Sequence, residues 1–407
     1  MDSTLCYIKN ENNEYLLIHR NRKENDLNEG KWIGVGGKFE ENETAEQCVI
    51  REVYEETGLT LTDYHIHGLV KFISDTWENE DMYLFSATGF TGELKTDCDE
   101  GELEWVAADK VLSLPTWEGD KYFLTPLLNG KDRIDMLVEY EGEKLIRCED
   151  LTEKIRTLKS PLIKCPHGFS TRTGGVSDGM FATLNLGMNR GDEKSRVIEN
   201  WNRFLDSAGI GSRSFVCGQQ VHGNNVVIAG KKDIRPAYGK GKMNVCDGYV
   251  TAEPGIPLAI FTADCVPLLL HDPVAGAIGA VHCGWRSAAA DIEKNTVSAL
   301  ESLGSKPSNI RAAIGPAIDR CCFEVGSEVI DAMRILIGSD IENYYDARGE
   351  KFMLDLRGVV RRRLEALGVR PENIDTVGNC TMCHPLEYFS HRGTKGNRGS
   401  LASVICL

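Results

Sequence analysis

The sequence predicts an α/β (α+β) protein of two domains, and three observations lead to this prediction. The chain has 407 residues, more than one compact domain usually contains. Residues 1–155 hold 35 acidic and 16 basic residues, whereas the remainder holds 26 acidic and 30 basic, and such a difference indicates separate units. Both parts mix short apolar runs typical of strands with longer amphipathic runs typical of helices. We expect domains at 1–152 and 158–407, joined where a short helical pattern ends before Pro161.

The composition excludes several classes of protein. Hydrophobic residues make up 42% and charged residues 26% of the chain, which is typical of packed globular domains. The N-terminus lacks the basic start and apolar run of a signal peptide, and no apolar run approaches the ~20 residues that cross a bilayer. We therefore expect a cytoplasmic protein without membrane contact, whose 14 cysteines are reduced thiols, metal ligands or nucleophiles. The acidic first part disfavours binding of a nucleic acid polymer, so we expect small-molecule partners. The sequence leaves the oligomeric state open.

In the first part, strand-like runs surround one strong helix. The runs "TLCYIK" (4–9) and "EYLLIHR" (14–20) flank the turn "NENN" as a hairpin, and 81–90 alternates like another strand. A helix is expected to begin near Thr44 and to end at Gly58, a residue suited to a C-terminal cap.

Three glutamates on this helix indicate a cation site. Glu52, Glu55 and Glu56 lie at positions i, i+3 and i+4, so their carboxylates share one face of the helix. Like charges at this spacing repel, and an all-oxygen cluster suits Mg²⁺ or Mn²⁺. Taken alone, such a run is equally typical of a solvated helix face.

The wider segment resembles the Nudix hydrolase signature. The matching residues, each at the family's spacing, are Gly37, Glu43, Arg51, Glu52, Val53, Glu55, Glu56, Gly58 and Leu59. The resemblance implies an α/β/α sandwich that hydrolyses a nucleoside diphosphate linked to another group. It also implies Mg²⁺ or Mn²⁺ held by Glu52, Glu55, Glu56 and the Gly37 carbonyl, with one carboxylate acting as base. Glu100 is a candidate further ligand, and three cationic residues are candidate phosphate contacts: Arg20, Arg22 and Lys23.

The flanking runs "EGKWIGVGGK" and "LPTWEGDKYFLTPLL" resemble the MutT-like triphosphatases that remove oxidised purine nucleotides. This resemblance implies a nucleoside triphosphate as substrate, with 8-oxo-dGTP as one candidate. Trp117 would then stack on the base and Asp120 would read its edge, although Ile33 replaces a polar base contact. Without the resemblance, Trp117 is more typical of a core or edge aromatic residue.

The second part combines apolar strand-like runs at 256–263 and 277–283 with helices near 286–303, 325–337 and 356–367. Cys265 follows the first run, His282 lies at the end of the second, and His222 comes from a third segment. If these runs are neighbouring strands, the side chains of Cys265 and His282 meet at one edge. Two imidazoles and a thiolate form a ligand set for Zn²⁺ or Cu²⁺ that leaves one position open for catalysis. The pair Cys380 and Cys383, with no second pair evident, is more typical of incidental cysteines than of a zinc site.

Residues from about Pro161 to Leu407 resemble the YfiH-like laccase-domain family, whose members are also described as purine nucleoside phosphorylases. The runs that carry the resemblance are "HGFSTRTGGVS", "LNLG", "QQVHG", "TADCVPLLL", "VHCGWR", "IGPAI", "FEVG" and "FSHRG". The resemblance implies an α/β domain with mixed sheets, a metal on His222, Cys265 and His282, and inorganic phosphate bound by Arg172. Arg286 and Asp264 are candidate substrate contacts. The histidines are too few and too scattered for a multicopper centre.

Together the two resemblances imply a bifunctional enzyme. One half would be a nucleoside triphosphate pyrophosphohydrolase. The other would be a phosphorylase for adenosine, inosine or methylthioadenosine with some adenosine deaminase activity. Two alternatives are that the second half is a cysteine hydrolase that edits a cell-wall precursor, with Cys265 as nucleophile, and that the Nudix half is a nucleotide sensor.

Overall fold

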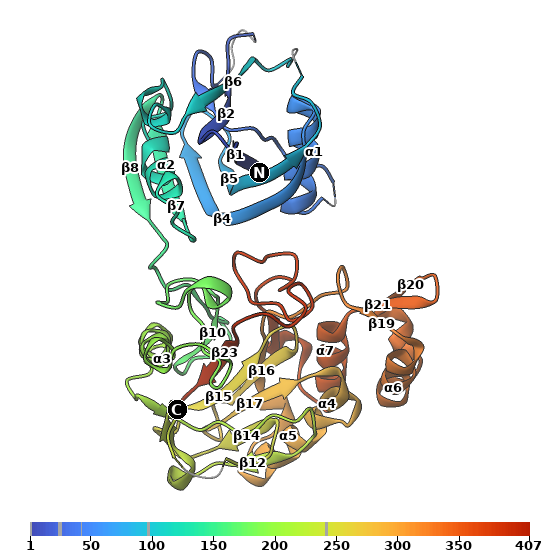
Figure 1. The fold of residues 1–407 in the computed structure, drawn as a ribbon. Helices are drawn as coiled ribbons and strands as arrows, with labels where there is room; N and C mark the ends of the chain where they lie inside the picture. Colours follow the sequence, from blue (N-terminus) through green and yellow to red (C-terminus); the bar gives the residue numbers. More distant parts are fainter. Residues whose placement is uncertain (1, 23–26, 42, 96–97, 241–242) are drawn as a thin grey trace. The chain divides into compact units, whose positions relative to one another are not determined.

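The computed structural model describes residues 2–22, 27–41, 43–95, 98–240 and 243–407. The chain divides into two compact units, Met1–Lys154 and Ile155–Leu407 (Figure 1). This division lies between the two ranges expected for the domains. None of the described helices is long and apolar enough to cross a membrane.

The N-terminal unit is a mixed sheet with helices on both faces, which confirms the predicted α/β/α sandwich. The strands follow the order β3-β2-β1-β5-β4-β7-β8, and β6 pairs with β2. Their bounds are β1 Asp2–Lys9, β2 Glu14–His19, β3 Trp32–Ile33, β4 Thr60–Ser74, β5 Glu80–Thr91, β6 Glu102–Ala107, β7 Met136–Glu141 and β8 Lys144–Asp150. The expected hairpin is β1 with β2, paired antiparallel with Ile8 opposite Leu16.

Side chains that alternate along the strands build two cores in this unit. Along β2, Leu16 and Ile18 pack in one cluster with Val49 and Val53 of helix α1 (Ala45–Thr57). Tyr15 and Leu17 point to the opposite face, where Phe123 and Leu124 of helix α2 (Asp120–Leu128) cover the sheet. Helix α1 begins at a capping box in which Thr44 and Gln47 exchange hydrogen bonds. It ends at Gly58, whose left-handed φ of 76° suits glycine.

The C-terminal unit contains two larger sheets, which confirms the predicted α/β domain with mixed sheets. The six-stranded sheet has the order β12 (Val226–Ile228), β14 (Gly248–Thr251), β17 (Ala277–Cys283), β16 (Val266–Asp272), β18 (Arg311–Ile314) and β22 (Ile374–Thr376). The four-stranded sheet has the order β15 (Leu258–Thr262), β23 (Leu401–Ile405), β10 (His167–Ser170) and β9 (Thr157–Leu158). Smaller sheets pair β11 (Ser214–Phe215) with β13 (Arg235–Pro236), and β21 (Lys351–Leu354) with β19 (Glu324–Val325) and β20 (Tyr345–Arg348).

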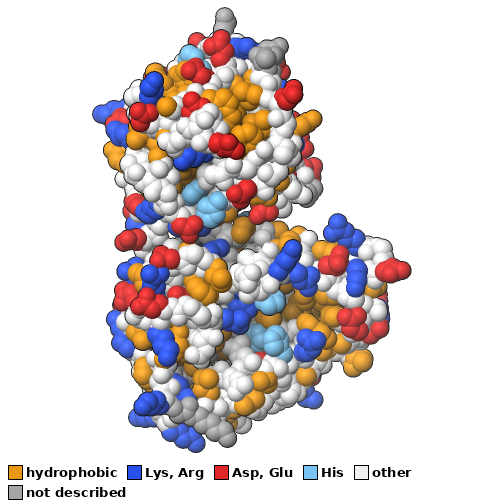
Figure 2. Space-filling view, in the orientation of Figure 1, with side chains coloured by type: hydrophobic (Ala, Val, Ile, Leu, Met, Phe, Trp, Pro, Cys, Tyr) orange, Lys and Arg blue, Asp and Glu red, His pale blue; other side chains and the backbone are white. Residues whose placement is uncertain are grey.

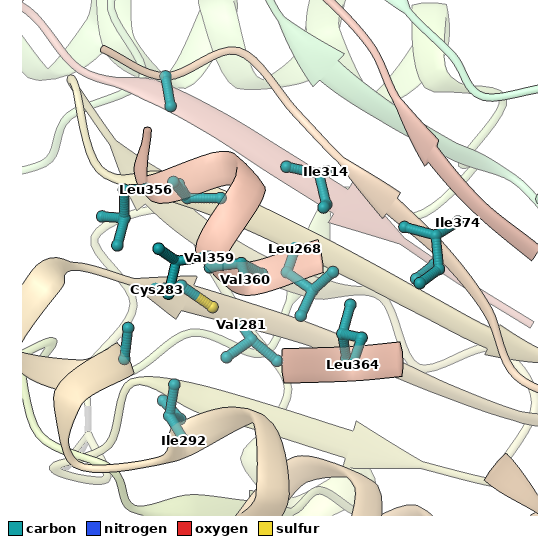
Figure 3. Packing of buried hydrophobic residues seen from close by; sticks show 14 of the residues in the cluster. Leu268, Val281, Cys283, Ile292, Ile314, Leu356, Val359, Val360, Leu364 and Ile374 are labelled. Atoms are coloured by element: carbon teal, nitrogen blue, oxygen red, sulfur yellow. The ribbon is translucent and has the colours of Figure 1, made fainter. Parts of the chain in front are cut away.

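The central strands are apolar on both faces because both faces are covered. In β16, Leu268 and Leu270 belong to the cluster beneath the helices, whereas Leu269 belongs to the cluster that also holds Leu258 and Ile405 of the four-stranded sheet. Figure 3 shows Leu268 and Val281 of the sheet among residues of the covering helix that include Val360 and Leu364. Burial on two faces explains why these runs lack the polar alternation of a half-exposed strand.

Five α-helices lie in the described part of the C-terminal unit. They are α3 (Lys194–Ala208), α4 (Trp285–Ala289), α5 (Ile292–Ser302), α6 (Ser327–Ile337) and α7 (Leu356–Ala366). The single helix expected near 286–303 is two helices, so that expectation was wrong. The break lies at Asp291, whose φ of 61° is left-handed and whose carboxylate is bound by two guanidinium nitrogens of Arg363, at 2.8 and 2.6 Å. An aspartate tolerates this conformation better than most residues do.

Candidate active sites

The glutamate cluster of the N-terminal unit lies where helix α1 passes the loop at Gly36 and Gly37. Glu56 is almost buried, and its carboxylate accepts a hydrogen bond from the Gly36 N–H at 3.0 Å. A Cβ on Gly37 would lie 2.5 Å from the carboxyl carbon of Glu52, so a larger residue there would displace this carboxylate from its present position. The Gly37 carbonyl accepts the N–H of Thr4 at 2.8 Å. The loop is therefore fixed beside the helix face that carries the acids.

Arg51 is the cation that orders this face. Its guanidinium donates to both oxygens of Glu43 at 2.9 and 2.8 Å, and also to Glu52 at 2.7 Å and to Glu55 at 3.1 Å. The arginine lowers the pKa of the Glu43 carboxyl, so Glu43 remains ionised. One arginine among these carboxylates leaves an excess of negative charge. The carboxylate oxygens are ligands that fit a hard divalent cation.

The other polar residues predicted for this site have separate partners. Glu100 forms an ion pair with Arg20, and Arg22 donates to the Cys98 carbonyl at 2.7 Å. Lys23, a candidate phosphate contact, lies outside the described residues. The assignments of Glu100 to metal and of these cations to phosphate stay predictions.

Trp117 and Asp120 line an aromatic cavity of about 80 Å³ together with Tyr7, Phe72 and Ile33. The indole N–H of Trp117 donates to the Asn28 side chain at 2.8 Å, and the ammonium group of Lys31 lies 4.2 Å from the ring centroid. Burial raises the pKa of Asp120 to about 7, although the Trp117 N–H opposes this shift. A neutral Asp120 carboxyl can donate as well as accept a hydrogen bond, which suits the edge of a base.

In the C-terminal unit, the side chains of His222, Cys265 and His282 meet as expected. Strands β16 and β17 are antiparallel, with Pro267 opposite His282, so the start of one strand lies beside the end of the other. One ligand atom from each of the three residues lies within 4.8 Å of the others. His282 is buried and His222 is exposed, so the set faces an opening. Burial and the neighbouring His282 lower the pKa of His222, which keeps its ring neutral and able to bind a metal.

Asp247 organises this ligand set. One carboxylate oxygen accepts hydrogen bonds from Nδ1 of His282 at 2.8 Å and from the backbone N–H of His222 at 3.0 Å. The other oxygen accepts the N–H groups of Val221 and Gly223 at 3.1 and 2.8 Å. Burial acts against ionisation, but the bond from His282 and these N–H groups lower the pKa of Asp247 overall, so it stays a carboxylate. With Nδ1 of His282 bound to Asp247, its Nε2 remains for a metal.

The three side chains lie in a cavity of about 590 Å³. Asp264 and Arg286 line this cavity, as do the arginines at 190, 392 and 398. In Figure 2, pale blue histidine and blue Lys or Arg side chains gather on one face of this unit. Burial and the neighbouring Arg190 lower the pKa of Arg398 to about 10, and its Nε has no hydrogen-bond partner among the described residues. Such a cationic lining suits an anion.

The remaining predicted contacts are placed differently. The Arg172 guanidinium donates to the carbonyls of Ala182 and Pro385 at 2.8 and 2.7 Å and lies over the Phe389 ring. Arg172 is not among the described residues that line the cavity, and its role in phosphate binding stays a prediction. Both carboxylate oxygens of Asp264 are occupied, one by the Thr381 hydroxyl at 2.7 Å and one by the Arg392 N–H at 2.6 Å.

Asp247, Arg190 and Arg398 were not found from the sequence. Asp247 precedes a strand in "CDGYV", where an aspartate is also typical of a turn. Both arginines stand before glycine, in "NRGD" and "NRGS", which marks them as loop residues without indicating that the two loops meet.

Comparison with known proteins also divides the chain into two parts. Residues 166–407 match the family described as multi-copper polyphenol oxidoreductase laccase, and residues 1–127 match the NUDIX domain. A purine nucleoside phosphorylase of Deinococcus radiodurans is 38% identical over 61% of this chain and 92% of its own length. The purine nucleoside phosphorylase YlmD of Bacillus subtilis is 35% identical over 58% of this chain and 87% of its own. The crystal structure of YlmD from Geobacillus stearothermophilus, 33% identical, aligns with a TM-score of 0.57 over 61% of this chain and 93% of that one.

Proposed function

Since the chain belongs to the multi-copper polyphenol oxidoreductase laccase family over residues 166–407 and has a NUDIX domain over residues 1–127, we propose that it is a bifunctional enzyme of nucleotide and nucleoside metabolism. The C-terminal unit would cleave purine nucleosides with inorganic phosphate. The N-terminal unit would hydrolyse nucleoside triphosphates. In this proposal each unit has its own active site and its own substrate.

The observation that carries the C-terminal assignment is the His222, Cys265 and His282 set inside a cavity with a cationic lining. Two imidazoles and a thiolate fit Zn²⁺ or Cu²⁺, which would supply Lewis-acid activation when bound. Arg398 and Arg190 would hold phosphate. A phosphate oxygen would form a bond to C1′ of the ribose while the bond from C1′ to the purine nitrogen breaks and the base takes up a proton. Adenosine, inosine and methylthioadenosine are the substrates proposed, with adenosine deamination as a side reaction.

The N-terminal assignment is supported by the ordered glutamate face beside Gly37 and by the aromatic cavity. Mg²⁺ or Mn²⁺ held by Glu52, Glu55, Glu56 and the Gly37 carbonyl would supply charge stabilisation for water attack on phosphorus. Trp117 would stack on the base and Asp120 would bind its edge. The substrate proposed is a purine nucleoside triphosphate, and 8-oxo-dGTP is the oxidised candidate to compare with dGTP.

A pair of variants tests both assignments on the full chain. Cys265→Ala removes one metal ligand and is expected to lose base release from adenosine while nucleoside triphosphate hydrolysis continues. Glu55→Gln is expected to show the reverse pattern, because its carboxylate belongs only to the N-terminal site. The products are separated by chromatography. Base release that persists in Cys265→Ala contradicts the C-terminal site, and triphosphate hydrolysis that persists in Glu55→Gln contradicts the N-terminal one.

One contact favours a second candidate for the C-terminal unit. Asp247 binds His282, and His282 lies beside Cys265, which is the order of groups in a cysteine hydrolase. Such an enzyme, acting on a cell-wall precursor, would form a covalent adduct on Cys265 in protein stripped of metal. An adduct found by mass spectrometry under those conditions favours the hydrolase over the phosphorylase.

A further inference from the structure

Four cysteines outside the sites described above gather at one point of the C-terminal unit. The side chains of Cys321, Cys322, Cys380 and Cys383 come within 4.8 Å of one another through their sulfur atoms. The sequence suggested that Cys380 and Cys383 are incidental, because no second pair was evident. The structure supplies that second pair from a distant segment, the adjacent Cys321 and Cys322.

The topology explains why the two pairs meet. Strands β18 and β22 are parallel neighbours, with Ile314 opposite Thr376, so the loops that follow them leave the sheet side by side. The pairing continues beyond the strands, where the Thr381 N–H donates to the Ala317 carbonyl at 3.0 Å. Cys380 lies at this pairing, opposite Ala317, and Cys383 follows in the same loop, while Cys321 and Cys322 follow Ala317 in the other loop.

The spacing of the sulfur atoms suits a metal better than a disulfide. The Sγ of Cys383 lies 3.4 Å from that of Cys321 and 3.3 Å from that of Cys322. A disulfide requires about 2.05 Å. Bonds of about 2.3 Å from a tetrahedral Zn²⁺ place thiolates roughly 3.8 Å apart. The observed separations are close to the second arrangement.

The surroundings also suit thiolates bound to a metal. The backbone N–H of Asp319 points at the Cys380 sulfur at 3.4 Å, a contact that stabilises a charged ligand. Cys380 is buried, whereas Cys321 is exposed and the other two are half-buried, so an ion can enter from solvent.

From this geometry we propose that Cys321, Cys322, Cys380 and Cys383 bind one Zn²⁺ as a structural tetrathiolate site. Four protein ligands leave no open position, so this site is closed, unlike the three-ligand set in the cavity. It is a second metal site in the same unit with a different task.

That task is to hold one wall of the cavity. The loop with Cys322 continues into Phe323, which lines the cavity, and the loop with Cys383 continues to His391 and Arg392, which line it as well. Thr381, between the ligands Cys380 and Cys383, donates to Asp264, the neighbour of Cys265. A metal on the four sulfurs would therefore tie both loops to the segment that carries Cys265.

The test measures metal in the full chain. The variant His222→Ala weakens the cavity site, and adding Cys383→Ser removes one ligand of the four-cysteine cluster. We expect His222→Ala protein to retain one zinc per chain by elemental analysis and the double variant to lose it. Cys165→Ser, in the same unit but outside the cluster, is the matched control and is expected to retain zinc in the same background.

Cobalt spectroscopy keeps the test decisive if the double variant folds poorly. Replacement of zinc by Co²⁺ in His222→Ala protein is expected to give the strong sulfur-to-cobalt charge-transfer bands of a tetrathiolate site, which zinc then abolishes. Three outcomes overturn the proposal: iron in place of zinc in the isolated protein, four cysteines oxidised to disulfides in a thiol titration, or cobalt bands that Cys383→Ser leaves unchanged.

Discussion

At the scale of single residues, the two candidate phosphate residues Arg172 and Arg398 differ in their partners and in their place relative to the cavity of the C-terminal unit. Arg172 donates to two backbone carbonyls, lies over an aromatic ring and is not among the described residues that line the cavity, whereas Arg398 lines it. One terminal nitrogen of Arg398 donates to the Gly399 carbonyl at 2.8 Å and to the Ser400 hydroxyl at 3.0 Å, and its Nε has no hydrogen-bond partner among the described residues. A guanidinium that lines the cavity can offer its remaining N–H donors to an anion bound there. The resemblance points to Arg172 as the phosphate residue, and the geometry favours Arg398 with Arg190.

We expect Arg398→Met to raise the KM for phosphate by roughly 10- to 100-fold, because one charged hydrogen-bonding partner of the anion is lost. The KM for the nucleoside should change little. The measurement is initial-rate kinetics with phosphate varied at saturating nucleoside, with Arg172→Met compared in parallel. A rise in phosphate KM confined to Arg172→Met would contradict the assignment to Arg398.

At the scale of secondary-structure elements, three segments must converge for the metal ligands to meet. The antiparallel pairing of β16 with β17 joins the segments of Cys265 and His282, and Asp247 attaches the loop of His222. The local patterns of apolar residues predicted β17 and α1. The other run expected beside β17, residues 256–263, is instead β15 of the four-stranded sheet, so that expectation was wrong, and Cys265 reaches His282 through β16. The local patterns did not predict the break at Asp291 or the role of Asp247, because both depend on partners distant in the sequence, Arg363 in one case and His282 in the other.

Asp247→Asn is therefore expected to weaken zinc binding at the cavity by roughly 10- to 100-fold while the fold is kept. The amide retains one acceptor, but it loses the charge that orients the His282 ring and part of the hydrogen bonding to the His222 loop. Competition with a chelator, followed by elemental analysis, measures this affinity. Unchanged zinc affinity would mean that Asp247 serves only the fold of the loop.

At the scale of the whole molecule, each of the two units has its own candidate site. The difference in charge between residues 1–155 and the remainder predicted this division. The sequence could not show which titratable side chains the fold buries, nor how burial changes their pKa values. Glu293 of α5 is fully buried, neither carboxyl oxygen has a hydrogen-bond partner among the described residues, and burial raises its pKa to about 8 from an ordinary value of 4.5. Between these values the folded state holds a proton that the unfolded state releases.

The stability of the C-terminal unit should consequently fall as pH rises from about 4.5 to about 8, by of order 5 kcal/mol from this group alone, and level off above. Glu293→Gln cannot release this proton. We expect the unfolding free energy of the variant relative to the natural chain to increase across that window, as measured by urea denaturation followed by circular dichroism. A difference that stays constant with pH would show that Glu293 is ionised in the folded protein.

We propose above that the C-terminal unit transfers the sugar of a purine nucleoside to phosphate. The most direct test is identification of the sugar product after the purified chain is incubated with adenosine, with and without inorganic phosphate. We expect adenine with ribose 1-phosphate, formed only when phosphate is present. Free ribose formed independently of phosphate, or no cleavage by protein that holds metal at the cavity, would contradict it.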